Sequence, residues 1–283
     1  MAMEPPLPGS ISLGGSMLKL AVFGAQTLLG RELVEVLETR DCSVLPLATG
    51  ALTEAQEEAD LVMFAPEPAL LEGLDAVILA DTPQAPELLE AFPGRILDLR
   101  EGADERVEPM PLAGVWPEGV KVLRGRPTIE QVLALIPQLV GGLTGLSGTH
   151  LRSVAHLGEK GLDGLMEQTL AVLQGEEPDT TGLGYRAAFE VIPEVGRGRF
   201  VEVKVPVFHG DLLILHLTGT ELSAKAAPEG CAWVDTPPTS RQVAVSKDLL
   251  AHLSPGTESA VLTLGFDPVL WGSLRPVLRV FGL

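Results

Sequence analysis

The stretch "LKLAVFGAQTLLGRELVEVLE", Leu18 to Glu38, decides the fold class. It opens with a short apolar run that ends at Gly24, and apolar residues then recur at helical spacing up to Leu37. A strand, a glycine turn and a helix in this order begin a βαβ unit. Further strand-like runs, "CSVLPLA", "LDAVILAD" and "GRILDL", follow. Residues 18–126 therefore predict a Rossmann-like domain on a parallel sheet, the α/β class.

The second half of the chain mixes helical and strand periodicities. One helix is predicted over residues 128–140, and "RFVEVKVPV" alternates apolar and polar residues as a half-buried antiparallel strand does. Another helix is predicted over "GLDGLMEQTLAVLQG", with a buried stripe formed by Leu162, Leu165, Met166, Thr169, Leu170 and Leu173. Residues 127–266 thus predict an α+β domain. Residues 1–17, rich in Pro, Gly and Ser, predict a flexible tail.

Charge and composition exclude several classes of function. The chain has 20 Lys and Arg against 38 Asp and Glu, a net charge of −18, which repels nucleic acid and anionic membrane surfaces. The same negative charge disfavours binding of a dinucleotide that carries an additional phosphate, such as NADP, unless a local basic pocket offsets it. No apolar run reaches the roughly 20 residues of a membrane-spanning helix, so we expect no membrane insertion and a cytoplasmic protein. Cys42 and Cys231 match no metal spacing, so no metal site is predicted.

Five stretches in this order resemble the aspartate-semialdehyde dehydrogenase family: "LAVFGAQTLLGRELVEVLE", "TIEQVLALIP", "GLDGLMEQTLAVLQGE", "AAFEVIPEV" and "VKVPVFHGD". The resemblance implies a Rossmann-like domain closed by the C-terminal segment 267–283, in which Pro276 should kink or interrupt the helix. It implies a second domain of the semialdehyde dehydrogenase type that dimerises through its sheet. It also implies NADP-dependent reductive dephosphorylation of an acyl phosphate through a cysteine thioester.

The catalytic positions of that family are replaced in this sequence. Counting back from "TIEQ" puts Arg126 at the nucleophilic cysteine, and a guanidinium has no lone pair with which to attack a carbonyl. In "KVPVFHGD", Lys204 stands at the substrate-binding arginine and Asp211 at the general-base histidine. We expect Arg126 and Asp211 to form an ion pair, because a lone buried charge is costly. The family's long insertion is reduced to residues 196–199, whose Arg197 and Arg199 are interpreted as a solvated basic turn.

The cofactor turn is altered as well. In "GAQTLLG", Gly24 and Gly30 remain, and Thr27 replaces the middle glycine between Gln26 and Leu28. A β-branched side chain there should obstruct the pyrophosphate of NADP or NAD. The stretch "LATGALTEAQEEAD", where the family holds the 2′-phosphate, has four acidic residues and no basic one. Arg100 and Arg106, which could reach a ligand, are interpreted as surface or structural charges.

These replacements favour a catalytically degenerate, semialdehyde dehydrogenase-like pseudoenzyme that acts as a scaffold, binding or regulatory subunit. The expected partners are a second copy of the chain and an unidentified cytoplasmic protein, and no cofactor is expected. Two enzymatic alternatives stay open. One uses Arg126, Lys204 and Asp211 on a small anionic substrate, and the other is a residual aspartate-semialdehyde dehydrogenase that binds NADP or NAD in a cleft that still works.

Overall fold

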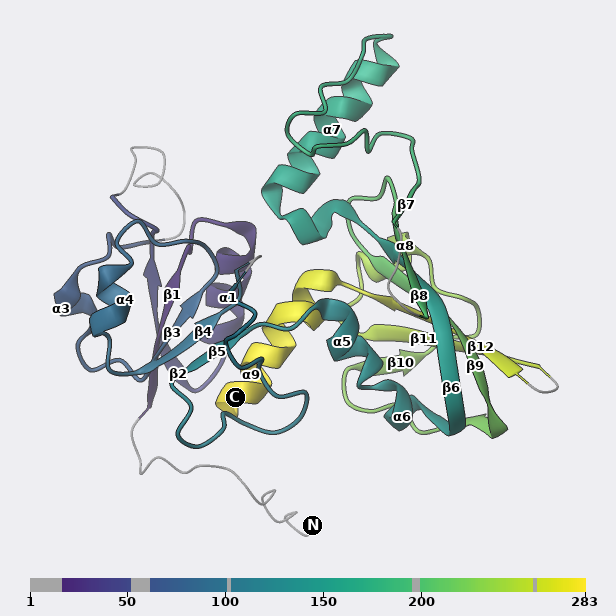
Figure 1. Ribbon diagram of the computed structural model, residues 1–283, viewed down its shortest axis with the longest axis horizontal. Coiled ribbons are helices and arrows are strands. Elements are labelled where there is room, and N and C mark those ends of the chain that lie inside the picture. The colour runs from purple at the N-terminus through teal and green to yellow at the C-terminus, as the bar shows by residue number, and fades with distance from the viewer. Residues whose placement is uncertain (1–16, 52–61, 101–102, 195–198, 257–258) are drawn as a thin grey trace. The chain divides into compact units, whose positions relative to one another are not determined.

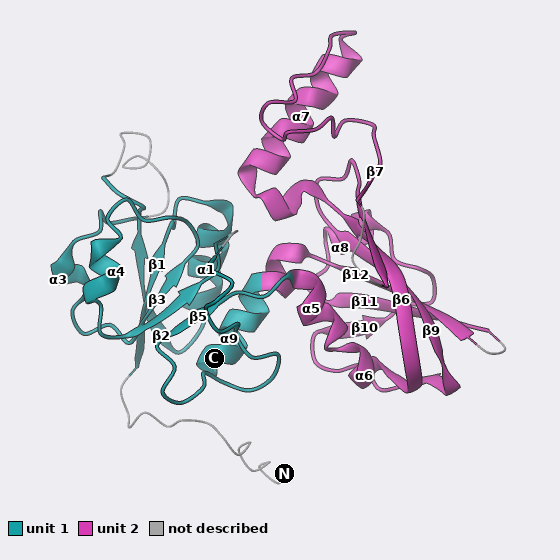
Figure 2. Cartoon of the chain, in the orientation of Figure 1, with its two compact units in different colours: residues 1–127, 273–283 teal, residues 128–272 magenta. Residues whose placement is uncertain are grey.

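The computed structural model of the 283-residue chain describes residues 17–51, 62–100, 103–194, 199–256 and 259–283. It divides into two compact units (Figure 2). Unit 1 comprises Met1–Pro127 and Ser273–Leu283, and unit 2 comprises Thr128–Gly272. Apart from Met17, the tail predicted over residues 1–17 lies outside the described residues.

Unit 1 is built on sheet A, in which five parallel strands follow the order β2-β1-β3-β4-β5 (Figure 1). Their bounds are β1 Leu18–Phe23, β2 Cys42–Leu47, β3 Ala76–Leu79, β4 Arg95–Asp98 and β5 Val122–Arg124. All four residues of β3 are buried, as expected for a central strand covered on both faces. The predicted Rossmann-like α/β class is confirmed.

The helices in the described part of unit 1 are α1 Leu28–Glu38, α3 Pro68–Leu71, α4 Glu87–Ala91 and α9 Arg275–Phe281. The C-terminal α9 buries Val277 and Val280, and the Val280 carbonyl accepts a 2.8 Å hydrogen bond from the Trp116 amide. Pro276 lies at the first turn of α9, directly after a π-helical turn, Leu270–Leu274. The predicted interruption at this proline is therefore confirmed, because proline is tolerated at a helix start and not inside one.

Unit 2 is built on sheet B, seven strands in the order β10-β11-β12-β9-β6-β8-β7 with parallel and antiparallel pairs. Their bounds are β6 Val140–Arg152, β7 Ile192–Glu194, β8 Phe200–Lys204, β9 Asp211–Ala224, β10 Cys231–Trp233, β11 Leu249–Pro255 and β12 Ser259–Phe266. The strand predicted over "RFVEVKVPV" ends at Lys204, and β8 pairs parallel to β6 and antiparallel only to the short β7. The purely antiparallel interpretation was wrong.

Two short helices cover one face of sheet B. They are α5 Thr128–Leu133 and α6 Ile136–Leu139, and Val132, Ile136 and Leu139 pack with Leu213 and Leu215 in one buried cluster. The continuous helix predicted over residues 128–140 was wrong, because Pro137 starts a separate helix and cannot donate a backbone hydrogen bond to the one before it.

Unit 2 also contains α8 Ser240–Val243, a 3-10 turn Val154–Leu157 and the 15-residue helix α7 Glu159–Leu173, which points away from sheet B (Figure 1). Leu165 is buried, as predicted, and Leu162 is partly buried. Met166, Leu170 and Leu173 are instead 49%, 51% and 71% exposed. The broad buried stripe predicted for this helix was therefore wrong, because among the described residues only a narrow face of α7, around Leu165, packs in a buried cluster.

Candidate functional site

Arg126 follows β5 in unit 1 and is held by the backbone around it. Its Nε donates a 2.5 Å hydrogen bond to the carbonyl of Met110, and the neighbouring Gly125 amide donates to the Asp98 carbonyl at 2.7 Å. Arg126 is a second cation close to Arg279, whose pKa is lowered first by burial and then by repulsion from Arg126. The position of the expected nucleophile thus holds a fixed positive charge, which can attract an anion but cannot form a thioester.

Asp211, at the position of the expected general base, is a buried structural acceptor. It is 1% exposed, and its Oδ1 accepts hydrogen bonds from the Ser153 amide at 2.9 Å and the Ser153 hydroxyl at 2.7 Å. Its Oδ2 lies 2.9 Å from Nε2 of His150. Three of the roughly four acceptor positions of the carboxylate are therefore occupied within unit 2. The reason given for an ion pair with Arg126, a lone buried charge, no longer applies.

His150 links Asp211 to a larger polar network. The His150 ring is 3% exposed and stacks on Phe266 with centroids 5.9 Å apart. Its Nδ1 lies 3.9 Å from Oε2 of Glu202, which in turn pairs with Arg152. His150 belongs to none of the motifs singled out in the sequence. The register of β6 against β9 and β8, which no local pattern reveals, brings these residues together.

Lys204, at the position of the substrate-binding arginine, already has a partner. Its Nζ lies 2.5 Å from Oε1 of Glu194 and 4.5 Å from the centroid of the Tyr185 ring. The hydrogen bond from Lys204, and then the nearby charge of Arg152, lower the pKa of Glu194. Within unit 2 the ammonium is therefore paired rather than directed at an open anion site.

The turn after β1 keeps the shape of a dinucleotide-binding turn. Gly24 has φ +83°, and a side chain there would clash with Asp81, while one at Gly30 would meet the Gly24 carbonyl. Thr27 caps α1: its hydroxyl donates to the Gly24 carbonyl at 2.8 Å and accepts from the Gly30 amide at 3.1 Å. A helix N-terminus that binds phosphate offers such amides to the ligand. Here Thr27 uses one of them.

Hydrogen bonds join the loops that follow the carboxyl ends of β1, β2 and β3. Gln26, after β1, donates from its side chain to the Thr49 hydroxyl at 3.0 Å, and the Gln84 amide donates to the Thr49 carbonyl at 2.7 Å. The Gln84 side chain also occupies the space beside Gly50. A dinucleotide binds in the crevice at these strand ends. Here the Thr27 hydroxyl bonds to the turn, and the Gln84 side chain takes up space beside Gly50 that such a ligand would approach. The four acidic residues of "LTEAQEEAD" lie outside the described residues.

Arg100 and Arg106 pair with acidic neighbours two residues away. The Arg100 guanidinium lies 2.6 Å from Asp98, and that of Arg106 lies 2.6 Å from Asp104. The hydrogen bonds from Arg106 lower the pKa of the exposed Asp104 to about 2. Both arginines therefore act as local charges at loop ends, which agrees with their interpretation from the sequence.

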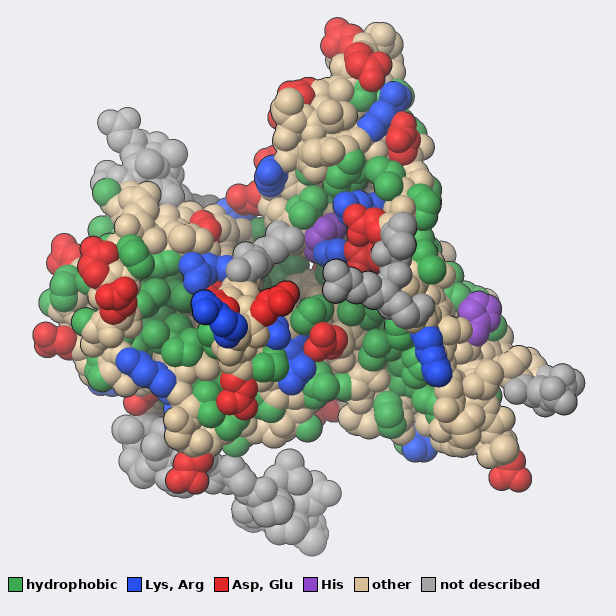
Figure 3. Space-filling model, in the orientation of Figure 1, with side chains coloured by type: hydrophobic (Ala, Val, Ile, Leu, Met, Phe, Trp, Pro, Cys, Tyr) green, Lys and Arg blue, Asp and Glu red, His purple; other side chains and the backbone are tan. Residues whose placement is uncertain are grey.

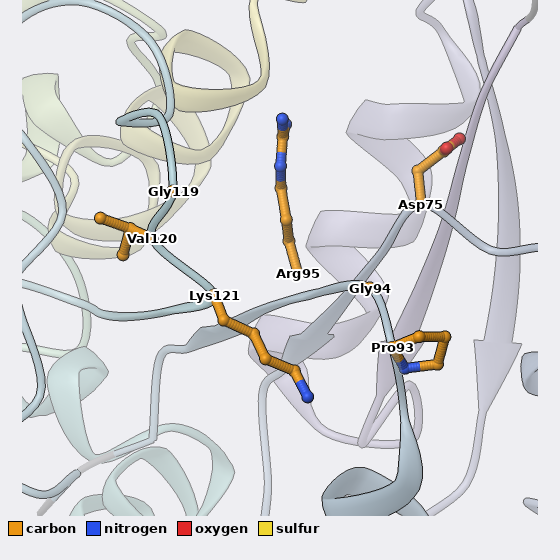
Figure 4. A pocket seen from close by; sticks show the side chains of 7 residues that line it. All are labelled: Asp75, Pro93, Gly94, Arg95, Gly119, Val120 and Lys121. Atoms are coloured by element: carbon orange, nitrogen blue, oxygen red, sulfur yellow. The ribbon is translucent and has the colours of Figure 1, made fainter.

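A hollow of about 430 Å³ lies at the amino ends of β3, β4 and β5, away from the carboxyl edge of the sheet. Its charged lining residues are Asp75, Arg95 and Lys121, and the Lys121 side chain points away from those of Arg95 and Asp75 (Figure 4). Diverging charges do not form a converging site. Among the described residues no group of three His, Cys, Asp or Glu could hold a metal ion, and no helix is long and apolar enough to cross a membrane.

Comparison with known proteins gives a likeness of structure alone. No family model matches the sequence, and no curated protein matches it. A probable aspartate-semialdehyde dehydrogenase from Pseudomonas aeruginosa superposes with a TM-score of 0.73 at 20% identity, over 93% of this chain and 97% of that chain. Aspartate semialdehyde dehydrogenase II from Vibrio cholerae, complexed with ASA, gives 0.70 at 18% identity over 94% and 97%.

The enzyme from Francisella tularensis gives a TM-score of 0.71 at 13% identity, over 94% of this chain and 99% of that chain. The match spans both units and nearly the whole length of each solved structure, so the resemblance read from the five sequence stretches extends to the three-dimensional fold. The chain has the aspartate-semialdehyde dehydrogenase fold.

Proposed function

We propose that this chain is a catalytically degenerate relative of the aspartate-semialdehyde dehydrogenases that works as a scaffold or binding subunit. The observation that carries the proposal is the environment of Asp211. A general base needs an accessible lone pair and a pKa near the working pH. Asp211 is 1% exposed and its oxygens are bonded to His150 and Ser153. This carboxylate stabilises the fold and is closed to substrate.

The first unit supports the same proposal. Arg126 cannot replace a thiolate, and the Thr27 hydroxyl holds the amide of Gly30 at the start of α1. NADP, which the resemblance implies, would have to displace the Thr27 cap and the contacts of Gln84 with Thr49 and Gly50. The chain thus lacks the residues that would form the thioester, and it lacks those that would bind the hydride donor NADP.

The proposed function is protein binding rather than catalysis. The first proposed partner is a second copy of the chain. The face of sheet B opposite α5 and α6, here called the outer face, is formed by residues that share one side by strand register. They are Ser147, Thr149, Leu151, Val201, Val203, Leu212, Ile214, His216, Thr218, His252, Val261 and Thr263. None of them is acidic in a chain with 38 acidic residues. A face that mixes apolar and uncharged polar residues, on an acidic protein, favours homodimerisation, with a cytoplasmic protein as a further partner.

The enzymatic alternative assigns Arg126, Lys204 and Asp211 to the binding and conversion of a small anionic substrate. It requires Lys204 to leave Glu194, and Asp211 to leave His150 and Ser153. Each departure leaves a charged group without its partner, which opposes this alternative.

The decisive experiment measures NADPH-dependent reduction of aspartyl phosphate, and the phosphate-dependent reverse reaction with aspartate semialdehyde. The Vibrio cholerae enzyme serves as the positive control. We expect no turnover above the protein-free rate for this chain, with NADP or with NAD. An Arg126→Cys variant should remain inactive, because Asp211 and the cofactor turn are unchanged in it. Turnover by the wild-type chain at even a thousandth of the control rate would refute the proposal.

Thermal unfolding with NADP, NAD and a panel of small anions tests the cofactor site separately. A ligand that binds only the native state raises the unfolding midpoint by mass action. We expect no shift with either dinucleotide. A clear shift without turnover would mean that the crevice still binds a nucleotide and that only the thioester chemistry is lost.

A further inference from the structure

Two arginine side chains from distant parts of the sequence are anchored on neighbouring carbonyl groups of unit 1. Nε of Arg126 donates a 2.5 Å hydrogen bond to the Met110 carbonyl, and Nη2 of Arg279 donates one of 2.8 Å to the Pro111 carbonyl. The two guanidinium groups are close enough for the charge of Arg126 to act on Arg279, whose pKa is lowered first by burial and then by this repulsion. Arg126 and Arg279 are here called the arginine pair.

Backbone hydrogen bonds fix the position of both cations. The Arg124 amide donates to the Glu108 carbonyl at 2.9 Å, and the Met110 amide donates to the Arg124 carbonyl at 2.8 Å, so the segment before the pair lies along β5 at the edge of sheet A. The other cation comes from α9, whose Val280 carbonyl accepts a 2.8 Å hydrogen bond from the Trp116 amide. The arginine pair is thus held by two elements that are separately attached to the same unit.

The arginine pair differs electrically from the other arginines of unit 1 described above. Hydrogen bonds to Asp98 and Asp104 raise the pKa of Arg100 and of Arg106, whereas the pKa of Arg279 is lowered. A carbonyl group orients a guanidinium but carries no net charge with which to neutralise it. A guanidinium also does not lose its proton at neutral pH. Two fixed positive charges therefore lie side by side, and a bound anion would reduce their repulsion.

The arginine pair is accessible from solvent and partly shielded from it. Both side chains are half-buried, and the loop that follows Pro111 is exposed at Leu112 and Gly114. Charge-assisted hydrogen bonds are stronger where water is partly excluded. Acidic side chains are present on the visible face of both units (Figure 3), in a chain of net charge −18. An anion therefore needs a local surplus of positive charge in order to bind, and the arginine pair supplies one.

We propose that Arg126 and Arg279 form a binding site for a small tetrahedral oxyanion with two negative charges, of which inorganic phosphate is the simplest. Each guanidinium presents a planar fork of donors that matches two oxygens of such an anion, and two guanidinium groups match its two charges. The site lies within unit 1 and uses neither Lys204 nor Asp211, so it is independent of the proposed function and of its enzymatic alternative. A bound anion joins α9 to the edge of sheet A and should stabilise unit 1.

Isothermal titration calorimetry of the full chain with inorganic phosphate tests the site, with sodium chloride holding the ionic strength constant. We expect one phosphate per chain, and Arg126→Gln and Arg279→Gln should each weaken the binding by at least about tenfold, because each removes one charged donor group. Arg106→Gln is the matched control, since Arg106 is a 90% exposed arginine of the same unit that pairs with Asp104. It should leave the dissociation constant unchanged. Absence of binding by the wild type, or an equal loss in the control, would overturn the proposal.

Thermal unfolding gives a second readout and separates a specific site from screening by salt. At matched ionic strength, phosphate and sulfate should both raise the unfolding midpoint of the wild type, and chloride should not. The shift should disappear in Arg126→Gln and in Arg279→Gln, with circular dichroism confirming that each variant is folded. If Arg279→Gln does not fold, Arg126→Gln alone decides the outcome. A shift of the same size in a folded variant of either arginine would show that the anion acts elsewhere on the chain.

Discussion

The turn Gly24–Gly30 and the segment Lys204–Asp211 both lie where the sequence resemblance places functional residues, and they differ in how far their hydrogen bonds reach. In the turn, both outer glycines remain and one side chain, Thr27, bonds to the backbone that a phosphate would use. In the second segment, the new carboxylate of Asp211 is part of a buried network of distant residues. The first arrangement is local and depends on one side chain, and the second is built into the core of unit 2.

The largest effect on the free energy of unfolding should come from removal of the Asp211 carboxylate. Asp211→Ala leaves His150 and Ser153 without their buried acceptor, and we expect a loss of about 3–5 kcal/mol in the free energy of unfolding. Urea unfolding measures it. The control Asp104→Ala breaks the exposed pair with Arg106 and should leave the urea midpoint unchanged. A loss no greater than that of the control would show that the network around Asp211 is not structural.

Substitutions in α7 compare a buried and an exposed leucine on one helix. Leu165→Ala should lower the free energy of unfolding by about 2–5 kcal/mol, because it leaves a cavity. Leu170→Ala should change it by no more than about 0.5 kcal/mol, measured at concentrations where the chain is monomeric. Equal losses at the two positions would mean that Leu170 is covered within a single chain.

A smaller effect is expected at the turn. Thr27→Ala removes the cap of α1 and should lower the free energy of unfolding by about 1 kcal/mol, whereas Thr27→Gly should lower it by only a few tenths. Neither variant should bind NADP in a thermal-shift assay, because Gln84 still fills the space beside Gly50. Binding by Thr27→Gly alone would mean that the Thr27 side chain is the only obstacle to a nucleotide at this turn.

The smallest effect is a pH dependence at Glu194. Its pKa is lowered in the native state by Lys204, so the interaction contributes fully above the ordinary value of 4.5 and is lost as the pH falls below it. Glu194→Gln should therefore be less stable than the wild type at pH 6, and the difference should shrink as the pH falls from 4.5 toward 3. Urea midpoints across this range measure it, with the exposed Glu38→Gln as control. A difference that is constant with pH would exclude the lowered pKa as its cause.

Local patterns predicted the parts of the molecule that depend on neighbours in sequence. The strand, turn and helix from Leu18 to Glu38 were readable because a period of two, a glycine turn and a period of 3.6 follow one another directly. The break at Pro137 was also readable but was missed. The pairing of Asp211 with His150 was not, because it depends on the register of two strands 61 residues apart. The exposed face of α7 was missed because periodicity marks an apolar face without showing what covers it.

The Thr27 cap changes what unit 1 requires in order to stay folded. An enzyme whose glycine turn is completed by a nucleotide gains native-state stability in proportion to the logarithm of the nucleotide concentration. In this chain the Thr27 hydroxyl bonds to Gly24 and Gly30, so the turn is stabilised by the chain's own side chain without a ligand. Under the proposed function, in which no dinucleotide binds, the lifetime of this protein should then be independent of the nicotinamide supply.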